Sequence, residues 1–246
     1  MALSSTLSYL AVGLGDGSVI LYKHLDQSLA SSTNLTALPK ARTIHESPTE
    51  PVTGLGFTEP TEENPTMSLF IVTISHVLVY QVTGKGSGGN PTVVDEIGSG
   101  LGCASIDWRS QEMIVARDEA IFVCGTEGRG NCYAYEGKPF YPFLSLPYVN
   151  FPCAIGHKSS IHTHLNYVVI VSPPFMPTAS AASATVRNFV ARSPNPNESD
   201  ITKVTVFEPE NKYVAYSGTF THDVREVISQ WGQIYILTSD GNVRIP

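Results

Sequence analysis

Residues 10–22 read Leu-Ala-Val-Gly-Leu-Gly-Asp-Gly-Ser-Val-Ile-Leu-Tyr, and residues 234–245 read Ile-Tyr-Ile-Leu-Thr-Ser-Asp-Gly-Asn-Val-Arg-Ile. In both stretches an Asp-Gly pair separates two short β-prone runs. Such a pair tolerates the positive φ angles of a tight turn between twisted antiparallel strands. Two weaker copies of the pattern lie between them, at residues 70–80 and 113–123. The chain therefore repeats a β-hairpin unit.

The remaining β-prone runs fall into groups that clusters of Gly, Pro, Ser, Asn and Asp separate. The most regular group fits four strands into about forty residues, which is the repeat length of a propeller blade. We therefore expect an all-β chain with the architecture of a WD40-like β-propeller, and a β-sandwich is the alternative. The expected strands are Tyr9–Val12, Val19–Lys23 and Arg42–His45; Val52–Phe57, Leu69–Ile74, Val77–Val82 and Thr92–Ile97; Ala104–Trp108, Met113–Ala116, Ala120–Cys124 and Cys132–Glu136; Ile161–His164, Tyr167–Val171, Lys203–Glu208 and Tyr213–Phe220; and Asp223–Ser229, Ile234–Thr238 and Val243–Ile245.

Composition agrees with many short strands. The chain has 246 residues, of which 42% are hydrophobic and 15% charged, with 20 glycines and 17 prolines. Charged residues fall below the roughly 25% that is usual, and the Gly and Pro content indicates many turns. No window keeps an apolar helical face for a dozen residues without meeting Gly or Pro, so an α/β fold is disfavoured.

Charge and hydropathy exclude some partners. The net charge is −7 and the pI about 5.4, so the chain has no basic field for nucleic acid. No apolar run reaches the roughly 18 residues of a membrane span, and the first residues lack the features of a signal peptide. We expect a cytoplasmic protein whose contact with membranes is indirect.

Candidate catalytic and metal-binding residues are few. His157, His162 and His164 form the one histidine cluster, and alternation along a strand would place the last two on one face. A tetrahedral zinc site needs three or four ligands with supporting hydrogen bonds, so we predict no metal site. There is no GxSxG motif and no pairing of a nucleophile with a base. We predict no catalytic residue, no cofactor and no enzymatic activity.

The four cysteines are scattered along the chain. We expect Cys103, Cys124, Cys132 and Cys153 to be buried free thiols.

Two arginines are candidates for binding a partner protein. Arg117 opens the polar turn Arg-Asp-Glu, and Arg129 stands between Gly128 and Gly130, which permit a second turn. A guanidinium on an exposed turn can bind a carboxylate of a partner.

Several stretches around these arginines resemble the vacuolar protein sorting-associated protein 11 family. They occur in the family's order and span nearly the whole chain: Ala11–Val19, Pro51–Phe57, Val115–Phe122, Gly128–Gly137, Lys212–Tyr216 and Gln230–Val243. The resemblance implies the amino-terminal β-propeller of a subunit shared by the HOPS and CORVET tethering complexes of endosomes and the vacuole or lysosome. Other class C vacuolar sorting subunits would then be its partners. The family's α-solenoid and RING regions lie beyond the stretches that match.

The resemblance also implies departures from the family. The match begins inside the family's propeller, so we expect residues 1–246 to form a partial propeller of four to five blades, with a flexible loop at 173–200. Residues 138–156 are an aromatic, proline-rich insert where the family runs almost directly from Glu136-Gly137 to His157-Lys158.

We hypothesise that this insert is a retained intron, because Gly137-Lys138 can be encoded by GGTAAG and Ile155-Gly156 by ATAGGN, which contain a splice donor and an acceptor. Sequencing the transcripts is expected to recover a spliced message without the segment. A mature message that keeps it would refute the hypothesis.

Two other interpretations remain open at this stage. A propeller-fold enzyme such as a glycoside hydrolase would place carboxylates around a central channel. A truncated, non-functional gene product would also account for the missing blades and the insert.

Overall fold

The computed structural model describes residues 1–26, 40–62, 65–82, 89–133, 136–137, 151–152, 158–172, 202–211 and 213–246. These residues form two compact units. The first comprises Met1–Ala116 and Phe122–Cys132, and the second comprises Arg117–Ile121 and Tyr133–Pro246. The expected insert at 138–156, apart from Phe151–Pro152, and the expected loop at 173–200 lie outside the described residues.

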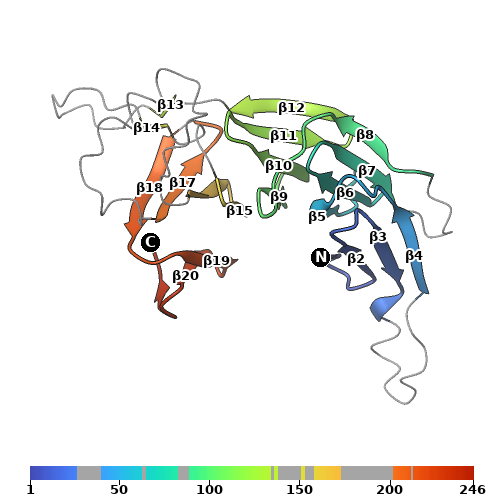
Figure 1. Ribbon diagram of the computed structural model, residues 1–246, viewed down its shortest axis with the longest axis horizontal. Coiled ribbons are helices and arrows are strands. Elements are labelled where there is room, and N and C mark those ends of the chain that lie inside the picture. Colours follow the sequence, from blue (N-terminus) through green and yellow to red (C-terminus); the bar gives the residue numbers. More distant parts are fainter. Residues whose placement is uncertain are drawn as a thin grey trace, which may run out of the picture. The chain divides into compact units, whose positions relative to one another are not determined.

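The first unit contains three antiparallel sheets of four strands, and each sheet follows the order of the chain (Figure 1). Strands that are consecutive in the chain are neighbours in each sheet, which is the meander expected from the hairpin repeat. The sheets are β1 (Ala2–Leu3), β2 (Tyr9–Gly13), β3 (Val19–Lys23) and β4 (Lys40–His45); β5 (Val52–Thr58), β6 (Ser68–Thr73), β7 (Val77–Gln81) and β8 (Thr92–Asp95); and β9 (Ala104–Asp107), β10 (Glu112–Ala116), β11 (Ile121–Gly125) and β12 (Gly128–Tyr133).

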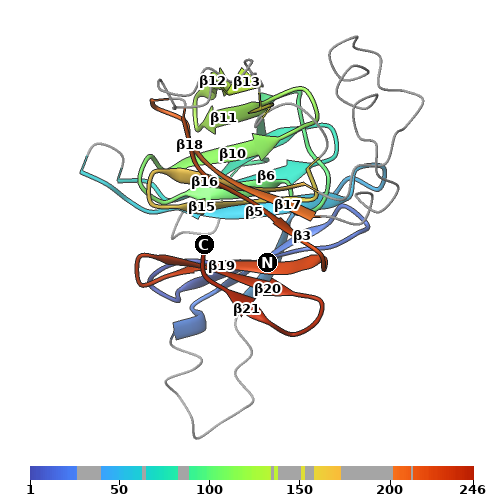
Figure 2. The same cartoon turned by 90° about the vertical axis from the view of Figure 1, so that its left-hand side faces the viewer.

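The second unit contains a four-stranded meander, a three-stranded meander and a short two-stranded pair. Figure 2 shows β19, β20 and β21 running side by side in the last sheet. The strands are β13 (Glu136–Gly137) and β14 (Phe151–Pro152); β15 (Ser160–His164), β16 (Tyr167–Ser172), β17 (Thr202–Glu208) and β18 (Tyr213–Phe220); and β19 (Val224–Gln230), β20 (Gln233–Thr238) and β21 (Val243–Arg244).

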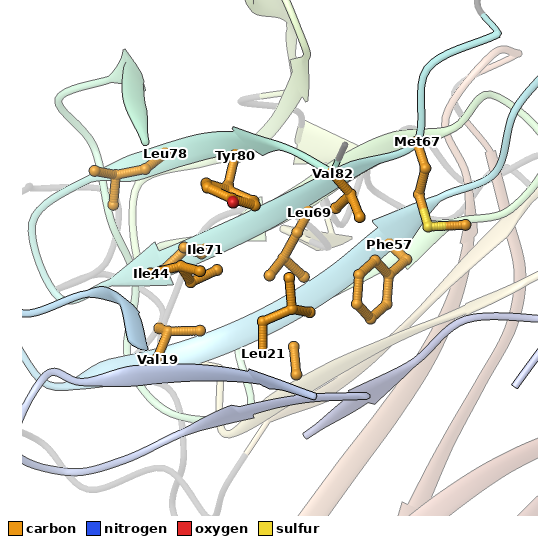
Figure 3. Close-up of a cluster of buried hydrophobic side chains, with 11 residues drawn as sticks. Val19, Leu21, Ile44, Phe57, Met67, Leu69, Ile71, Leu78, Tyr80 and Val82 are labelled. Atoms are coloured by element: carbon orange, nitrogen blue, oxygen red, sulfur yellow. The ribbon is translucent and has the colours of Figure 1, made fainter. Parts of the chain in front are cut away.

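The core of the first unit lies between stacked sheets. All six residues of β6 are buried, because successive side chains of a strand point to opposite faces and both faces are covered. Leu69 and Ile71 pack with Val19 and Leu21 of the first sheet (Figure 3). On the opposite face, side chains of β6 pack with the third sheet, in a cluster that contains Phe70, Val72, Ile106, Met113 and Val115.

The second unit is built by the same rule. Val169 and Val171 of β16 share a buried cluster with Val227 and Ile236 of the three-stranded sheet. Fully burying an aliphatic side chain of this size stabilises a fold by about 1.5–3 kcal/mol. Stacking of sheet on sheet is therefore the main source of stability in each unit.

The two Asp-Gly hairpins differ from the expected turn in one respect. Gly17 and Gly241 have φ angles of 83° and 81°, but neither aspartate has a positive φ. The Gly17 N–H donates to the Leu14 carbonyl, and the Gly241 N–H donates to the Thr238 carbonyl. This is the three-residue hairpin loop, a type I turn followed by a glycine in the left-handed region, and not the two-residue turn. The aspartates act through their side chains, since Asp16 Oδ1 accepts the N–H of Ser18 at 2.9 Å.

The predicted strands are confirmed with small shifts at their ends. The largest shift concerns β12, expected at Cys132–Glu136 and found at Gly128–Tyr133. Gly128 enters the strand with a φ of 147°, and Gly130 lies within the strand and not in a turn. A glycine pair that suggested a loop is therefore part of an edge strand. Strand β1 was not expected.

The connections between first and second strands of the three sheets in the first unit are joined to one another. The Ser5 N–H donates to Glu59 Oε1 at 2.7 Å, and the Glu59 N–H donates to Gln111 Oε1 at 2.6 Å. These bonds link residues 54 and 52 positions apart in sequence.

Among the described residues, no helix is long and apolar enough to cross a membrane.

Comparing Gly17→Ala with Gly241→Ala separates the free-energy cost of a left-handed φ from the cost of a steric clash of the new Cβ. Both replace a left-handed residue, which costs about 1–2 kcal/mol. A Cβ at Gly17 would also lie 1.9 Å from the Ser47 carbonyl oxygen, whereas a Cβ at Gly241 meets nothing within 4 Å. We expect urea unfolding to show about 1–3 kcal/mol more destabilisation for Gly17→Ala than for Gly241→Ala. Equal losses would mean that the close approach of Ser47 is not a constraint.

Candidate interaction surface

Arg129 lies on β12, an edge strand whose central residues are all exposed. Its side chain keeps 46% of its surface accessible, and its Nε lies 3.4 Å from Asp95 Oδ2. The guanidinium also lies over the ring of Phe122, 5.7 Å from the ring centroid. Arg129 is therefore held on one side by its own unit and reaches solvent on the other.

Asp95, at the end of β8, explains why Arg129 is held. The Asp95 side chain is only 7% exposed, and a buried carboxylate is costly without a cationic or hydrogen-bonding partner. Cys124 Sγ lies 3.9 Å from Asp95 Oδ2. Burial, and after it the Asp95 charge, raises the pKa of the Cys124 thiol to about 12. Cys124 therefore stays a neutral thiol, and Arg129 balances the carboxylate.

Arg117 occupies the turn between β10 and β11, as its sequence predicted. The turn closes through a hydrogen bond from the Arg117 N–H to the Ala120 carbonyl. Its Nε lies 3.0 Å from Glu119 Oε1, and both side chains are exposed. Its carbonyl accepts a hydrogen bond from Lys158 Nζ at 2.5 Å.

The two arginines belong to different units, so each is a separate candidate position. Each guanidinium has a carboxylate neighbour from its own unit, Asp95 for Arg129 and Glu119 for Arg117. An acidic partner group would compete with that neighbour or add to it.

The histidine cluster is used for packing in the second unit. His164 is buried, and its Nδ1 lies 2.5 Å from Ser229 Oγ of the neighbouring sheet. His162 Nε2 lies 3.2 Å from Ser160 Oγ, and burial lowers the pKa of the His162 imidazole. His157 lies outside the described residues. Within the described part of the chain, no group of three or more His, Cys, Asp or Glu side chains is placed to hold a metal ion.

The expectation for the cysteines is correct for two of them and wrong for one. Cys103 and Cys124 are buried free thiols, but Cys132 is exposed. The reason is that β12 lies at the edge of its sheet, where Cys132 is one of four consecutive exposed residues. Cys153 lies outside the described residues.

Sequence reasoning missed a second polar cluster in the first unit. Glu50 Oε2 lies 2.8 Å from His76 Nδ1 and accepts a hydrogen bond from Thr73 Oγ1 at 3.0 Å. The hydrogen bond with His76 is the main cause that lowers the pKa of Glu50. Glu50 and His76 are 26 positions apart, and no local pattern marks them. The cluster ties the entry to β5 to the turn between β6 and β7.

Solved structures of low sequence identity share this architecture. The structure of the Dos1 propeller matches with a TM-score of 0.53 at 10% identity, over 99% of this chain and 55% of that chain. BBS1N, solved in complex with ARL6DN, matches with a TM-score of 0.53 at 12% identity, over 96% of this chain and 60% of that chain. Stacked four-stranded meanders and this likeness define the chain as a β-propeller protein, which confirms the predicted fold class.

Sequence comparison then gives the family. The sequence model of the family described as PEP5/VPS11 N-terminal matches residues 1–245, and the chain belongs to that family. Proteins named vacuolar protein sorting-associated protein 11 homolog are 30% identical over 247 residues in Mus musculus and in Homo sapiens. A homolog of the same name in Dictyostelium discoideum is 26% identical. The match covers 99% of this chain but 22% of the mouse and human relatives, so the chain spans about a fifth of their length.

Arg129→Met is expected to destabilise the first unit, because it leaves the buried Asp95 carboxylate without its cation. The guanidinium is half-exposed and partly screened, so we expect a loss of about 1–2 kcal/mol in the free energy of unfolding. Arg117→Met is the matched control, since its pair with Glu119 is exposed and worth at most about 1 kcal/mol. Adding Asp95→Asn to Arg129→Met should restore part of the loss in urea unfolding. A double variant no more stable than Arg129→Met would contradict the proposed pairing.

Proposed function

We propose that this chain is a non-catalytic propeller scaffold of a HOPS- or CORVET-like membrane-tethering complex of endosomes and the vacuole or lysosome. It would mediate protein–protein interactions in vesicle docking and fusion, and in protein transport to the vacuole or lysosome. Membership of the PEP5/VPS11 N-terminal family along residues 1–245 is the observation that carries this proposal. The relatives are named for vacuolar protein sorting, which supports a role in that process.

A binding role suits the way in which charged groups are used. Asp95 is balanced by Arg129, and Glu50 accepts hydrogen bonds that join two parts of the first unit. These groups support the fold, and no reaction needs to be assigned to them. The exposed parts of Arg117 and Arg129 are proposed to contact acidic groups of partner subunits. An interface of ordinary size would bury roughly 1,200–2,000 Å² in total.

The proposed partners are the other class C vacuolar sorting subunits, and the proposed location is the cytoplasmic surface of endosomes and the vacuole or lysosome. A net charge of −7 opposes direct attraction to anionic lipids, which favours membrane contact through other subunits. Residues 1–246 are proposed to act as part of a propeller in this assembly.

Affinity purification of the endogenous, tagged protein followed by mass spectrometry tests the proposal. We expect the other class C subunits to be enriched over a purification from untagged cells, because a scaffold remains bound to its assembly under mild conditions. Immunofluorescence should place the protein on endosomes and the vacuole or lysosome. Failure to recover any of these subunits at native expression would refute the proposed function.

A further inference from the structure

Two neighbouring hairpin turns in the second unit each expose a large apolar side chain. Leu165 follows β15 and is 65% exposed, and Trp231 follows β19 and is 83% exposed. Each stands first in a two-residue connection, since His164 pairs with Tyr167 and Gln230 pairs with Gln233. The hydrogen-bonding contact between His164 Nδ1 and Ser229 Oγ, 2.5 Å long, holds the ends of β15 and β19 beside each other. The β19–β20 hairpin is visible in Figure 2.

Both side chains sit on strained backbone. Leu165 has a φ of 53° and Trp231 a φ of 52°, in the left-handed region that bulky residues rarely adopt. Gly232 follows Trp231 with a φ of 73°, so this turn has the geometry for which Asn-Gly is the favoured pair. An exposed Trp at this position gains little packing within its own unit. Backbone strain of this kind clusters at functional positions.

The residues of the two turns carry few charges, and this indicates which kind of partner could bind them. Residues 162–167 and 228–235 contain no Asp, Glu, Lys or Arg. Their polar groups include the Tyr235 hydroxyl, which donates to Gln233 Oε1 at 2.7 Å. Two carboxylates on adjacent strands lie close by: Glu226 acts on His162, and Glu208 acts on Tyr213, whose hydroxyl lies 3.1 Å from that of Tyr167. Exposed apolar anchors with few charges beside them are typical of the centre of a protein–protein interface. An anionic membrane would instead require nearby basic residues.

The corresponding connections of the first unit also expose large apolar side chains. Leu7, with a φ of 57°, and Trp108 are exposed in the connections from first to second strand of two of its sheets. Hydrogen bonds join these connections: the Ser5 N–H donates to the Glu59 carboxylate, and the Glu59 N–H donates to the Gln111 side chain. An exposed Leu or Trp thus occurs in the first connection of several sheets.

We propose that Leu165 and Trp231 form a docking surface, the turn surface, for a weakly charged apolar segment of another subunit of the tethering complex. This inference rests on the proposed function and adds the surface that performs it. Trp231 would insert as the anchor, with Leu165 beside it. A bound partner would bury both side chains.

Trp231→Asn tests the turn surface, because a structural role and a docking role predict opposite changes in stability. The full chain is co-expressed with the other class C subunits, and their recovery and affinity are measured. We expect binding to weaken roughly 30-fold, as for an aromatic anchor in an interface. The melting temperature of the Trp231→Asn variant is expected to be about 2–4 °C higher than that of the unaltered chain, because Asn-Gly fits this turn without strain. Leu165→Asn should weaken binding less and leave the melting temperature equal or higher.

Leu101→Asn is the matched control, because Leu101 is a 79% exposed leucine in a turn outside the turn surface. It should bind as the unaltered chain does. Unchanged binding by Trp231→Asn would overturn the inference and leave the proposed function intact. A lower melting temperature for Trp231→Asn would also overturn it, by showing that Trp231 serves the fold. If the unaltered chain recovers no subunit, the proposed function fails and the inference fails with it.

Fluorescence distinguishes a protein partner from a lipid surface. The chain has 2 tryptophans, so Trp108→Phe leaves Trp231 as the single fluorophore. Addition of the purified subunits should shift its emission to shorter wavelength and protect it from acrylamide. Vesicles of phosphatidylcholine with phosphatidylserine should leave the emission unchanged. A shift with vesicles and none with the subunits would assign the turn surface to membranes and overturn the proposal.

Discussion

Stacking of sheet on sheet is the interaction on which the rest of each unit depends. A small antiparallel sheet cannot be stable alone, because it must cover its apolar face. In the first unit the second sheet is covered on both faces, so every residue of β6 is buried. Alternating side chains of one strand serve two different cores, with Leu69 and Ile71 in one and Phe70 and Val72 in the other. This constraint explains why the strands are short, regular and rich in β-branched residues.

Stacking also determines which polar groups need partners. Asp95 stands at the end of β8, next to the largely buried strand β7, and Arg129 from the edge of the next sheet supplies the opposite charge. Glu50, His76 and Thr73 meet in the same way between a strand entry and a turn. Two exposed apolar side chains, Leu165 and Trp231, stand in turns of the second unit on backbone in the left-handed region.

Family membership and the propeller architecture both support the proposed function as a binding scaffold. A propeller offers several turns in a repeated arrangement, and partner binding can be added at those turns without disturbing the sheets. The chain covers about a fifth of the length of its mouse and human relatives. The separation between a rigid interior and turns that carry recognition is what a scaffold requires.

The class of fold, the strands and the family could be predicted from the sequence, because alternation of apolar residues, Asp-Gly turns and short motifs are local signals. The positive φ angles of Gly17 and Gly241 follow from the same signals. Three other features became clear only from the folded chain: Gly130 lies in an edge strand, Cys132 is exposed, and Arg129 faces Asp95. The tertiary structure alone brought Leu165 beside Trp231 through His164 and Ser229, which are 65 positions apart. Those facts depend on which sheet edges and turns come together in space, and no periodicity within a strand encodes them.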